Sequence, residues 1–396
     1  MRAPLSTETP VRVLMVLEAA YPAQRGGGAE AQVRTLSRAL RARGHRVTVL
    51  APQLRDGLQG RVCRVDGVPV VRLRYPHIRL FSGPLLWLTL AAFLVRRRHR
   101  YDAWHVHIAH RMGAVCALLG SWLDKRVLAK VSGWWELEMG TLAPNAPFWD
   151  RIAYKALLRI GTWQVISQRI AKTLAARGIP AERIAAIPNA VDTQRFAGVT
   201  RAPDAPARFV FIGRLEKEKG LDTLLDAFSD IAPAHPQASL LVVGTGSLEE
   251  GLKARAQALG IATQVDFAGH RNDIERVLAD ANLGVLPSRI EGLSNTLLES
   301  MASGLPMVAS RISGNEDFVR AETGWLFEPG DRAGLAQALA QAAALPAHAR
   351  QAMGEAARVA VERQAGLERV LARLLAIYRG QPAPVQERSA LAGTGI

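Results

Sequence analysis

Two glutamates with a defined spacing are the strongest chemical signal in this sequence. Glu291 and Glu299 are separated by seven residues and follow an apolar segment, residues 283–288, that is typical of a buried strand. The pattern places Glu291 in the loop after that strand and Glu299 near the start of the next helix. Both carboxylates should then face one crevice at the carboxyl ends of a parallel sheet, where open α/β sheets bind ligands.

The segment between the two glutamates is suited to binding phosphate. The first N–H groups of a helix lack partners within the helix, and the helix dipole adds positive charge there. We therefore expect this backbone to hold a diphosphate, with Gly292 permitting close approach and Ser294 or Asn295 capping the helix. Glu291 would contact a transferred sugar, and Glu299 would accept hydrogen bonds from a ribose diol. The predicted donor-binding residues here are Gly292, Leu293, Ser294, Asn295, Thr296 and Glu299.

A cationic loop follows a second apolar strand and contains Gly213, Arg214 and Lys219. Transfer of a glycosyl group leaves negative charge on the departing phosphate, which an arginine fork and a lysine point charge can stabilise. We predict that Arg214 and Lys219 act in catalysis together with Glu291. Lys217, in the same loop, is expected to be only a solvated surface residue.

Two other motifs suggest chemistry of a different kind. The Gly244-Thr-Gly-Ser-Leu-Glu249 segment follows a strand as a dinucleotide fingerprint would, but Glu249 stands where the third glycine belongs. NAD binding is therefore poorly supported. The Trp134-Trp135 pair could stack on a pyranose ring, or it could be part of the core or of an interface.

Apolar strand candidates alternate with helical patterns along both halves of the chain, which predicts an α/β protein with doubly wound parallel sheets. Residues 30–43 have the apolar spacing of a helix, and Gly44 is suited to end it. Residues 200–207 have the composition of a linker, after which the alternation restarts. Strands are predicted at 11–17, 46–50, 68–73, 103–107, 126–131, 164–167, 208–212, 239–243, 265–268, 283–286 and 306–309.

The charge of the chain is unevenly distributed. The net charge is +15, but residues 1–200 carry 30 basic and 12 acidic residues (+18), whereas the rest carries 20 and 23 (−3). The first half should therefore meet an anionic partner, such as a phospholipid surface, a lipid-linked phosphate or nucleic acid, or else arginine fills solvated positions there. The two cysteines, Cys63 and Cys116, are too few for a disulfide framework or a zinc site and favour a reducing compartment.

Residues 80–95 carry no charge over 16 positions, and Arg96-Arg-Arg-His-Arg100 closes this segment. A membrane span needs about 20 apolar residues, so no span is predicted. We favour a buried helix with a solvated basic end over a helix lying in a membrane interface. Residues 11–17 are too short and wrongly flanked for a signal peptide, and they predict a buried first strand.

Four features together resemble the GT-B glycosyltransferases of family 4. They are the Arg214/Lys219 loop, the Glu291/Glu299 pair, the glycine loop at residues 26–30 and the Ile187-Pro-Asn-Ala-Val-Asp192 segment. The likeness covers about residues 11–380 and implies two Rossmann-like doubly wound domains facing a central cleft. With the linker, it divides the chain into an acceptor-side domain (1–200), a nucleotide-sugar domain (208–365), a helix crossing back to the first domain (366–380) and a flexible tail (381–396).

The resemblance also implies roles for individual residues. In that family the donor phosphates are held by residues matching Arg214 and Lys219, and the ribose by the residue matching Glu299. The base is usually contacted by a loop after a later strand, and a glycine loop covers the phosphates or the sugar near the acceptor. In this chain those two loops contain His270 and Arg271, and Gly27 and Gly28, respectively.

One departure from the family concerns a histidine near the transferred sugar. Many relatives carry it after the strand matching residues 126–131, where this chain has Ser132. His107 and His110, which follow an earlier strand, are candidate substitutes on the acceptor side. The sequence has no Asp-x-Asp pair, which agrees with a metal-independent mechanism, and no cofactor is expected besides the nucleotide-sugar co-substrate.

The predicted function is retaining transfer of a hexose from a UDP-sugar or GDP-mannose to a hydroxyl of a polysaccharide or lipid-linked glycan. The protein is expected in the cytoplasm, with peripheral contact to the anionic inner face of the cell membrane as a further expectation. A non-hydrolysing sugar-nucleotide epimerase of similar architecture remains an alternative, and an NAD-dependent oxidoreductase is a weaker one. Nucleic-acid binding is not expected, because the sequence has no recognisable reading module.

Overall fold

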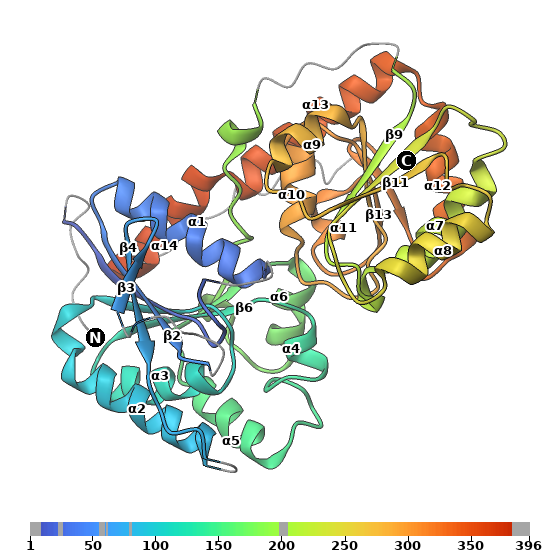
Figure 1. The fold of residues 1–396 in the computed structure, drawn as a ribbon. Helices are drawn as coiled ribbons and strands as arrows, with labels where there is room; N and C mark the ends of the chain where they lie inside the picture. The colour runs from blue at the N-terminus through green and yellow to red at the C-terminus, as the bar shows by residue number, and fades with distance from the viewer. Residues whose placement is uncertain are drawn as a thin grey trace.

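The computed structural model consists of two α/β domains, each built around one largely parallel sheet (Figure 1). The structure describes residues 9–22, 27–54, 60, 62–78, 81–197 and 205–381. Gly26 of the glycine loop, most of the predicted linker and the predicted tail beyond residue 381 lie outside these residues. The predicted fold class is confirmed.

The first sheet has eight strands in the order β3-β4-β2-β1-β5-β6-β7-β8, and only β3 runs antiparallel to its neighbour. The central strand β1 is buried on both faces, as its unbroken apolar sequence requires in a parallel sheet. Six of the strands were predicted, and β3 and β8 were missed. The strands are β1 Arg12–Val16, β2 Arg46–Pro52, β3 Val62–Val65, β4 Val68–Leu73, β5 Ala103–Val106, β6 Arg126–Val131, β7 Thr162–Val165 and β8 Ile184–Ala186.

The second sheet is fully parallel, with the order β11-β10-β9-β12-β13-β14. Its five predicted strands are confirmed, and β14 is additional. Because β9 pairs with both β10 and β12, the chain reverses its direction of winding at β9, and the loops after β9 and β12 lie beside each other. The strands are β9 Arg208–Ile212, β10 Ser239–Val243, β11 Val265–Gly269, β12 Leu283–Leu286, β13 Met307–Ser310 and β14 Gly324–Phe327.

Helices cover both faces of the first sheet. α1 (Gly28–Ala42) packs on one face together with the last helix, α14 (Leu367–Arg379). On the other face α2 (Ser82–Arg96), α3 (Arg111–Trp122) and α5 (Phe148–Leu157) lie side by side (Figure 1). The remaining helices are α4 Trp135–Glu138, α6 Gln168–Ala176, α7 Leu221–Ile231, α8 Glu249–Ala258, α9 Ile274–Asp280, α10 Asn295–Ala302, α11 Asn315–Phe318, α12 Arg332–Ala344 and α13 Ala347–Ala365.

The predicted end of α1 is confirmed. Gly44 adopts a positive φ of 83°, and its N–H and that of His45 donate to the carbonyls of Arg41 and Leu40. This geometry satisfies carbonyls at the end of the helix, and glycine adopts it without the steric cost of a Cβ atom. The chain then turns directly into β2, so that α1 joins two parallel strands as the sequence predicted.

The chain crosses between the domains twice, and the two crossings are hydrogen-bonded to each other. The N–H of Val191 donates to the carbonyl of Ala365 at 3.0 Å, and the N–H of Leu367 donates to the carbonyl of Val191 at 2.9 Å. α14 then packs into the core of the first domain, where the Tyr378 hydroxyl lies 2.7 Å from His105 Nδ1. The last helix therefore ties the end of the chain to the first domain.

The prediction of a buried helix for residues 80–95 was only half right. α2 buries Leu86, Leu90 and Leu94, but its opposite side is open, and Leu88 is 67% exposed. The sequence misled because α2 is apolar all round, a pattern that favours complete burial. None of the described helices is long and apolar enough to cross a membrane.

Candidate active site

The loops after the neighbouring strands β9 and β12 bring two predicted catalytic residues together. Lys219 Nζ donates a hydrogen bond to Glu291 Oε1, and both side chains are mostly buried. Ser288 Oγ also donates to Glu291 Oε1, at 3.3 Å. Arg214 is more open, with 58% of its side chain exposed, and it pairs with Glu218 at 2.8 Å. This edge of the sheet therefore presents two cations and a fixed carboxylate.

Glu299 lies in α10 with its carboxylate largely enclosed. Burial raises its pKa to about 7, with Glu275 adding to the rise and Arg195 opposing it. Among the described residues, no side chain or backbone N–H donates a hydrogen bond to it. Arg195 and Glu275 beside it form an ion pair with each other. Glu299 therefore has unused acceptor capacity, which a ligand with hydroxyl groups could fill.

Arg195 is a neighbour of Glu299 that the sequence did not reveal. It lies in a short 3₁₀ helix, Thr193–Phe196, directly after the first crossing between the domains. Its only sequence signal was its place just after the Ile187–Asp192 segment. Its importance comes from the contact between this segment and α10, which only the tertiary structure establishes.

The start of α10 lacks the side-chain cap that the sequence predicted. Ser294 occupies the N-cap position, but no side chain caps the helix, so the predicted capping role of Ser294 and Asn295 was wrong. Asn295 instead faces the other domain, where its Oδ1 accepts from Asn189 at 2.9 Å and from Gln32 at 3.1 Å. Its Nδ2 donates to the Gly28 carbonyl at 3.2 Å. The hydrogen bonds of the Asn295 amide are used between the domains, so they cannot serve the helix end.

We call Gln32, Asn189 and Asn295 the interdomain amide cluster. Asn189 Nδ2 also donates to the Leu293 carbonyl at 2.9 Å, and its Oδ1 accepts from the buried Lys130 at 2.6 Å. Burial lowers the pKa of Lys130 to about 7. Through this cluster the N-terminal ends of α1 and α10 meet, so the predicted Gly27–Gly28 turn lies close to the predicted diphosphate loop.

Glycines allow very close backbone contacts around this site. A Cβ atom on Gly292 would lie 2.6 Å from the Ser132 carbonyl oxygen of the other domain, and one on Gly314 would lie 2.2 Å from the Gly292 carbonyl oxygen. In the motif resembling a dinucleotide fingerprint, a Cβ on Gly244 would lie 1.8 Å from the carbonyl oxygen of Gly213. Close packing of two loops therefore explains the glycine there without any nucleotide.

Glu136 is a buried carboxylate that the sequence analysis missed. Its oxygens accept four hydrogen bonds: from the backbone N–H groups of Ser132 (2.6 Å), Gly133 (3.1 Å) and Ala109 (3.0 Å), and from Ser132 Oγ (2.5 Å). Burial raises the pKa of Glu136 to about 7, and these hydrogen bonds oppose the rise. Glu136 thus joins the loops after β5 and β6. The Ser132 hydroxyl, predicted to lie near the sugar, is engaged with Glu136.

Replacing Glu136 by glutamine should lower the free energy of unfolding by about 1–3 kcal/mol, because the new amide nitrogen cannot accept a hydrogen bond from a buried donor. Urea unfolding at about pH 5, where the raised pKa of Glu136 costs the folded state little, measures this difference. Glu182→Gln is the matched control, because Glu182 is exposed at the surface of the same domain. Equal losses of stability in the two variants would contradict the role assigned to Glu136.

The two candidate histidines have different surroundings. His107 is completely buried, stacks on His105 with ring centroids 4.0 Å apart, and its Nε2 lies 3.1 Å from Met15 Sδ. Burial lowers its pKa well below the usual range. The prediction of His107 as an acceptor-side residue is therefore corrected: it is a neutral core residue without access to a ligand.

His110 remains at the surface of the site. Its Nδ1 lies 2.9 Å from Glu18 Oε1, and this hydrogen bond raises the pKa of His110. Its Nε2 lies 3.8 Å from Asp150, which also pairs with Arg111. His110 is thus held at the carboxyl end of β5 between two carboxylates, which favour its protonated form.

The predicted base-contacting loop lies at the edge of the second sheet. His270 and Arg271 follow β11 and are exposed. His270 Nε2 lies 3.2 Å from Asn272 Oδ1, and Arg271 pairs with Asp273 at 2.6 Å. The next helix, α9, carries Glu275, so this loop leads directly to the neighbours of Glu299.

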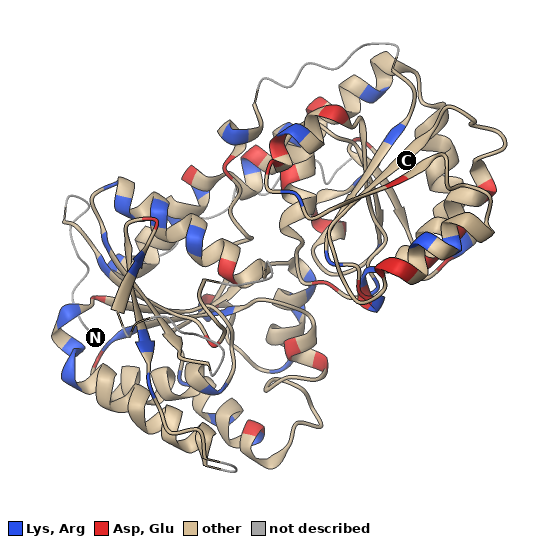
Figure 2. Cartoon of the chain, viewed as in Figure 1, with Lys and Arg blue, Asp and Glu red and all other residues tan. Residues whose placement is uncertain are grey.

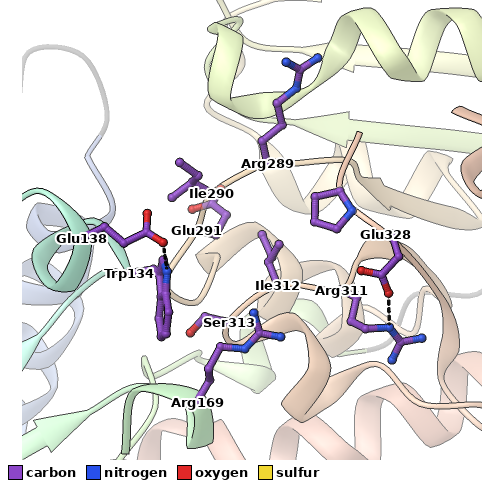
Figure 3. A pocket seen from close by; sticks show the side chains of 11 residues that line it. Trp134, Glu138, Arg169, Arg289, Ile290, Glu291, Arg311, Ile312, Ser313 and Glu328 are labelled. Carbon is purple, nitrogen blue, oxygen red and sulfur yellow. Dashed lines mark hydrogen bonds and ion pairs between the residues drawn. The ribbon is translucent and has the colours of Figure 1, made fainter. Parts of the chain in front are cut away.

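A pocket of about 320 Å³ lies between the domains beside Glu291 (Figure 3). Trp134 lines it from the first domain, and its Nε1 donates to Glu138 at 2.5 Å. Three arginines line it as well, and each is paired with a carboxylate. Trp134 is therefore part of this pocket, whereas the neighbouring Trp135 is 40% exposed. The lining residues are Trp134, Glu138, Arg169, Arg289, Ile290, Glu291, Arg311, Ile312, Ser313, Glu328 and Pro329.

Comparison with known proteins agrees with this architecture. Residues 26–195 match the family model Glycosyltransferase Family 4, and residues 192–360 match Glycosyl transferases group 1. Glycogen synthase of Mycobacterium tuberculosis is 28% identical over 358 residues, which cover 83% of this chain and 85% of that protein.

Solved structures with the same fold have low sequence identity to this chain. A glycosyltransferase from Rickettsia africae superposes with a TM-score of 0.74 at 18% identity, covering 94% of this chain and 98% of that one. HepE from Anabaena, in complex with UDP, superposes with a TM-score of 0.72 at 18% identity, covering 92% and 98%. With the two family models together spanning residues 26–360, the chain belongs to the group 1 glycosyl transferases, a family of glycosyltransferases with the GT-B fold.

Proposed function

We propose that this glycosyltransferase moves a hexose from a UDP- or GDP-sugar to a hydroxyl of a glycan acceptor, with retention of anomeric configuration and without a metal ion. The observation that carries the proposal is Glu299, an enclosed carboxylate with unused acceptor capacity on α10, the helix that follows the loop of Glu291. Such a carboxylate suits the ribose diol of a nucleotide, and the cations Lys219 and Arg214 suit its diphosphate. HepE, which has the same fold, has been solved with UDP-glucose and with UDP and glucose.

In the proposed reaction the bond between the anomeric carbon and the donor phosphate oxygen breaks, and the acceptor oxygen forms a bond to the same carbon. The proton of the acceptor hydroxyl passes to the departing diphosphate on the same face. Lys219 and Arg214 stabilise the charge that develops on this diphosphate, while Glu291 orients the sugar. The contacts between the domains exclude water, which would otherwise hydrolyse the donor.

The pocket beside Glu291 supports a saccharide acceptor. Trp134 offers an aromatic surface, and the charged residues of the lining are three arginines and three glutamates, so the pocket is electrically balanced. Paired guanidinium and carboxylate groups offer both donors and acceptors to a molecule with many hydroxyl groups. Glycogen synthase of Mycobacterium tuberculosis, a relative over most of the chain, is by its name an enzyme of polysaccharide synthesis.

A melting-temperature screen against UDP, GDP, ADP, NAD, UDP-glucose and GDP-mannose tests the donor. One nucleotide and its sugar conjugate should stabilise the protein by mass action. The stabilisation should be lost in Glu299→Gln and retained in Glu250→Gln, because Glu250 is exposed on α8 of the same domain. Stabilisation by NAD alone, or by none of these ligands, would overturn the proposed donor class.

The stereochemistry, the metal independence and the alternative function are tested on the donor that the screen identifies. Proton NMR of the sugar first released by slow hydrolysis should show the α-anomer, as in the donor. Turnover should survive treatment with EDTA if no metal ion takes part. A nucleotide-linked epimer formed without any acceptor would instead support the epimerase alternative.

Donor affinity should be about tenfold higher at pH 8 than at pH 6. The pKa of Glu299 is raised to about 7, and protonation removes the acceptor capacity that a ribose diol requires, so binding weakens as the pH falls through 7. Isothermal titration calorimetry with an intact nucleotide sugar measures how the affinity changes with pH. The ligand does not contribute to this change, because its diphosphate does not titrate in this range. Glu299→Gln should bind the donor weakly, with an affinity that does not depend on pH. A pH dependence that persists in this variant would assign the titration to another group.

A further inference from the structure

The outward side of α2, α3 and α5 carries an unusual number of exposed apolar residues. Each of these helices lies between two parallel strands, so all three run in the same direction and bury one side against the sheet. Their other side, with the residues that cap them, holds eight of the fifteen large apolar side chains exposed in the described chain, whereas the second domain holds two. We call these eight the α2–α3–α5 face: Phe81, Leu88, Leu118, Trp122, Phe148, Trp149, Ile152 and Leu158.

Aromatic rings make this face different from ordinary scattered surface residues. Trp122 is 74% exposed at the end of α3, and Phe148 and Trp149 are 61% and 59% exposed at the start of α5. Large exposed patches of this kind mark interaction sites, and tryptophan in particular favours the boundary between lipid and water. The patch therefore needs a partner with an apolar component.

The charged residues around the face indicate that its apolar partner is also anionic. The three helices contain a single acidic residue, Asp150, whose side chain is 8% exposed and paired with Arg111. Figure 2 shows α2 without charge along its length and basic residues at its end. In the part of the chain that the structure describes, no ion pair neutralises the basic residues that border the face: Arg96, Arg97, Arg98, Arg100, Arg151, Lys155 and Arg159.

We propose that the α2–α3–α5 face docks on an anionic membrane surface. Its apolar side chains would enter the boundary of the acyl region, while the seven bordering cations would meet lipid phosphates. A second copy of this chain fits the face less well, because a two-fold interface would bring the same cations together, and the one acid of the three helices, Asp150, already pairs with Arg111.

The position of the face relative to the site fits an acceptor held in a membrane, an argument that rests on the proposed function. α2 follows β4 and α5 follows β6, so the first residues of both helices lie at the carboxyl ends of the strands. Phe81, Phe148 and Trp149 are therefore at the same edge of the sheet as the active site. Docking through them would bring the mouth of the site to the lipid surface, where a lipid-linked glycan presents its hydroxyl.

Flotation of the full chain with vesicles tests the docking directly. The protein should float with vesicles of phosphatidylcholine and phosphatidylglycerol at about 0.05 M salt and much less at about 0.5 M, since exposed charges are screened. Arg151→Gln/Lys155→Gln/Arg159→Gln should weaken partitioning by about fivefold for each charge removed. Leu88→Ser/Trp122→Ser/Trp149→Ser should weaken it by at least about tenfold. Leu248→Ser/Lys253→Gln, at the surface of the second domain, is the matched control and should float as the unchanged protein does.

Three results would overturn the proposal. In the first, the unchanged protein fails to float with anionic vesicles at low salt. In the second, the unchanged and substituted proteins float equally. In the third, sedimentation shows a stable dimer that the apolar substitutions dissociate. The melting-temperature response to nucleotides is measured on the same samples. A variant that still responds to nucleotide but does not float has lost only the docking face, so failure of this inference is distinguishable from failure of the proposed donor site.

Discussion

Replacing Lys219 by methionine should lower the turnover of the donor by about 100- to 1,000-fold, the usual cost of removing one preorganised charge from a developing anion. Lys219 is mostly buried and directed at Glu291 by their ion pair, so its charge is held in place before the reaction starts. Methionine keeps much of the length of the side chain and removes the charge. Sugar release from the donor identified by the melting-temperature screen measures the effect.

Lys217→Met is the matched control for this prediction. Lys217 lies two residues earlier in the same loop but is exposed, and its replacement should change turnover by less than about twofold. Nucleotide affinity should fall much less than turnover in Lys219→Met, because the charge matters most when the phosphate departs. Equal losses of affinity and turnover would show that Lys219 only binds the ground state. Equal behaviour of the two variants would remove Lys219 from the reaction.

Gly292→Ala should lower donor turnover by about 100-fold or more, because the domains could no longer approach as they do here. A Cβ atom would lie 2.6 Å from the Ser132 carbonyl oxygen and 2.7 Å from Gly133 Cα, both in the backbone of the other domain. Neither atom belongs to a flexible side chain, so one loop must move. Glu136 holds the loop of the first domain with four hydrogen bonds, so the loop carrying Glu291 is expected to shift.

Two measurements on Gly292→Ala distinguish an effect on the approach of the two domains from an effect on nucleotide binding. Nucleotide affinity, which the second domain supplies, should fall by less than about tenfold, whereas small-angle scattering should show a larger radius of gyration. Gly251→Ala is the matched control, since a Cβ atom there meets no atom within 4 Å and alanine is a better helix former than glycine. Turnover close to that of the unchanged protein in Gly292→Ala would contradict an essential contact between Gly292 and the first domain.

Burial, which the sequence does not show, explains why one side of the site was harder to predict than the other. On the donor side, Lys219 and Glu291 come from loops that follow apolar strands, and parallel strands place such loops at one edge. On the acceptor side, His107 and His110 have the same sequence signal, a histidine near a strand end. Burial separates them: His107 is enclosed against Met15, while His110 lies between Glu18 and Asp150.

Local pattern was sufficient for much of the fold. Eleven strands were located from apolar runs bounded by turn residues, because a strand covered on both faces must be apolar throughout. Of the three strands that were not predicted, β3 and β8 lack a long apolar run. β3 is an edge strand with alternating exposure, joined to β4 through Asp66 and Gly67 at positive φ, and β8 has only three residues.

By itself, the sequence determined the two parallel sheets and the positions of Lys219, Glu291 and Glu299 on the loops and helix that follow β9 and β12, because these depend on contacts between neighbours along the chain or between adjacent strands. Only the tertiary structure decided the environment of Glu299, the amide cluster around Asn295, the role of Glu136 and the exposed side of α2. These depend on contacts between residues far apart in sequence. No local spacing encodes such contacts, since the same glutamate or leucine can be buried or open depending on what packs against it.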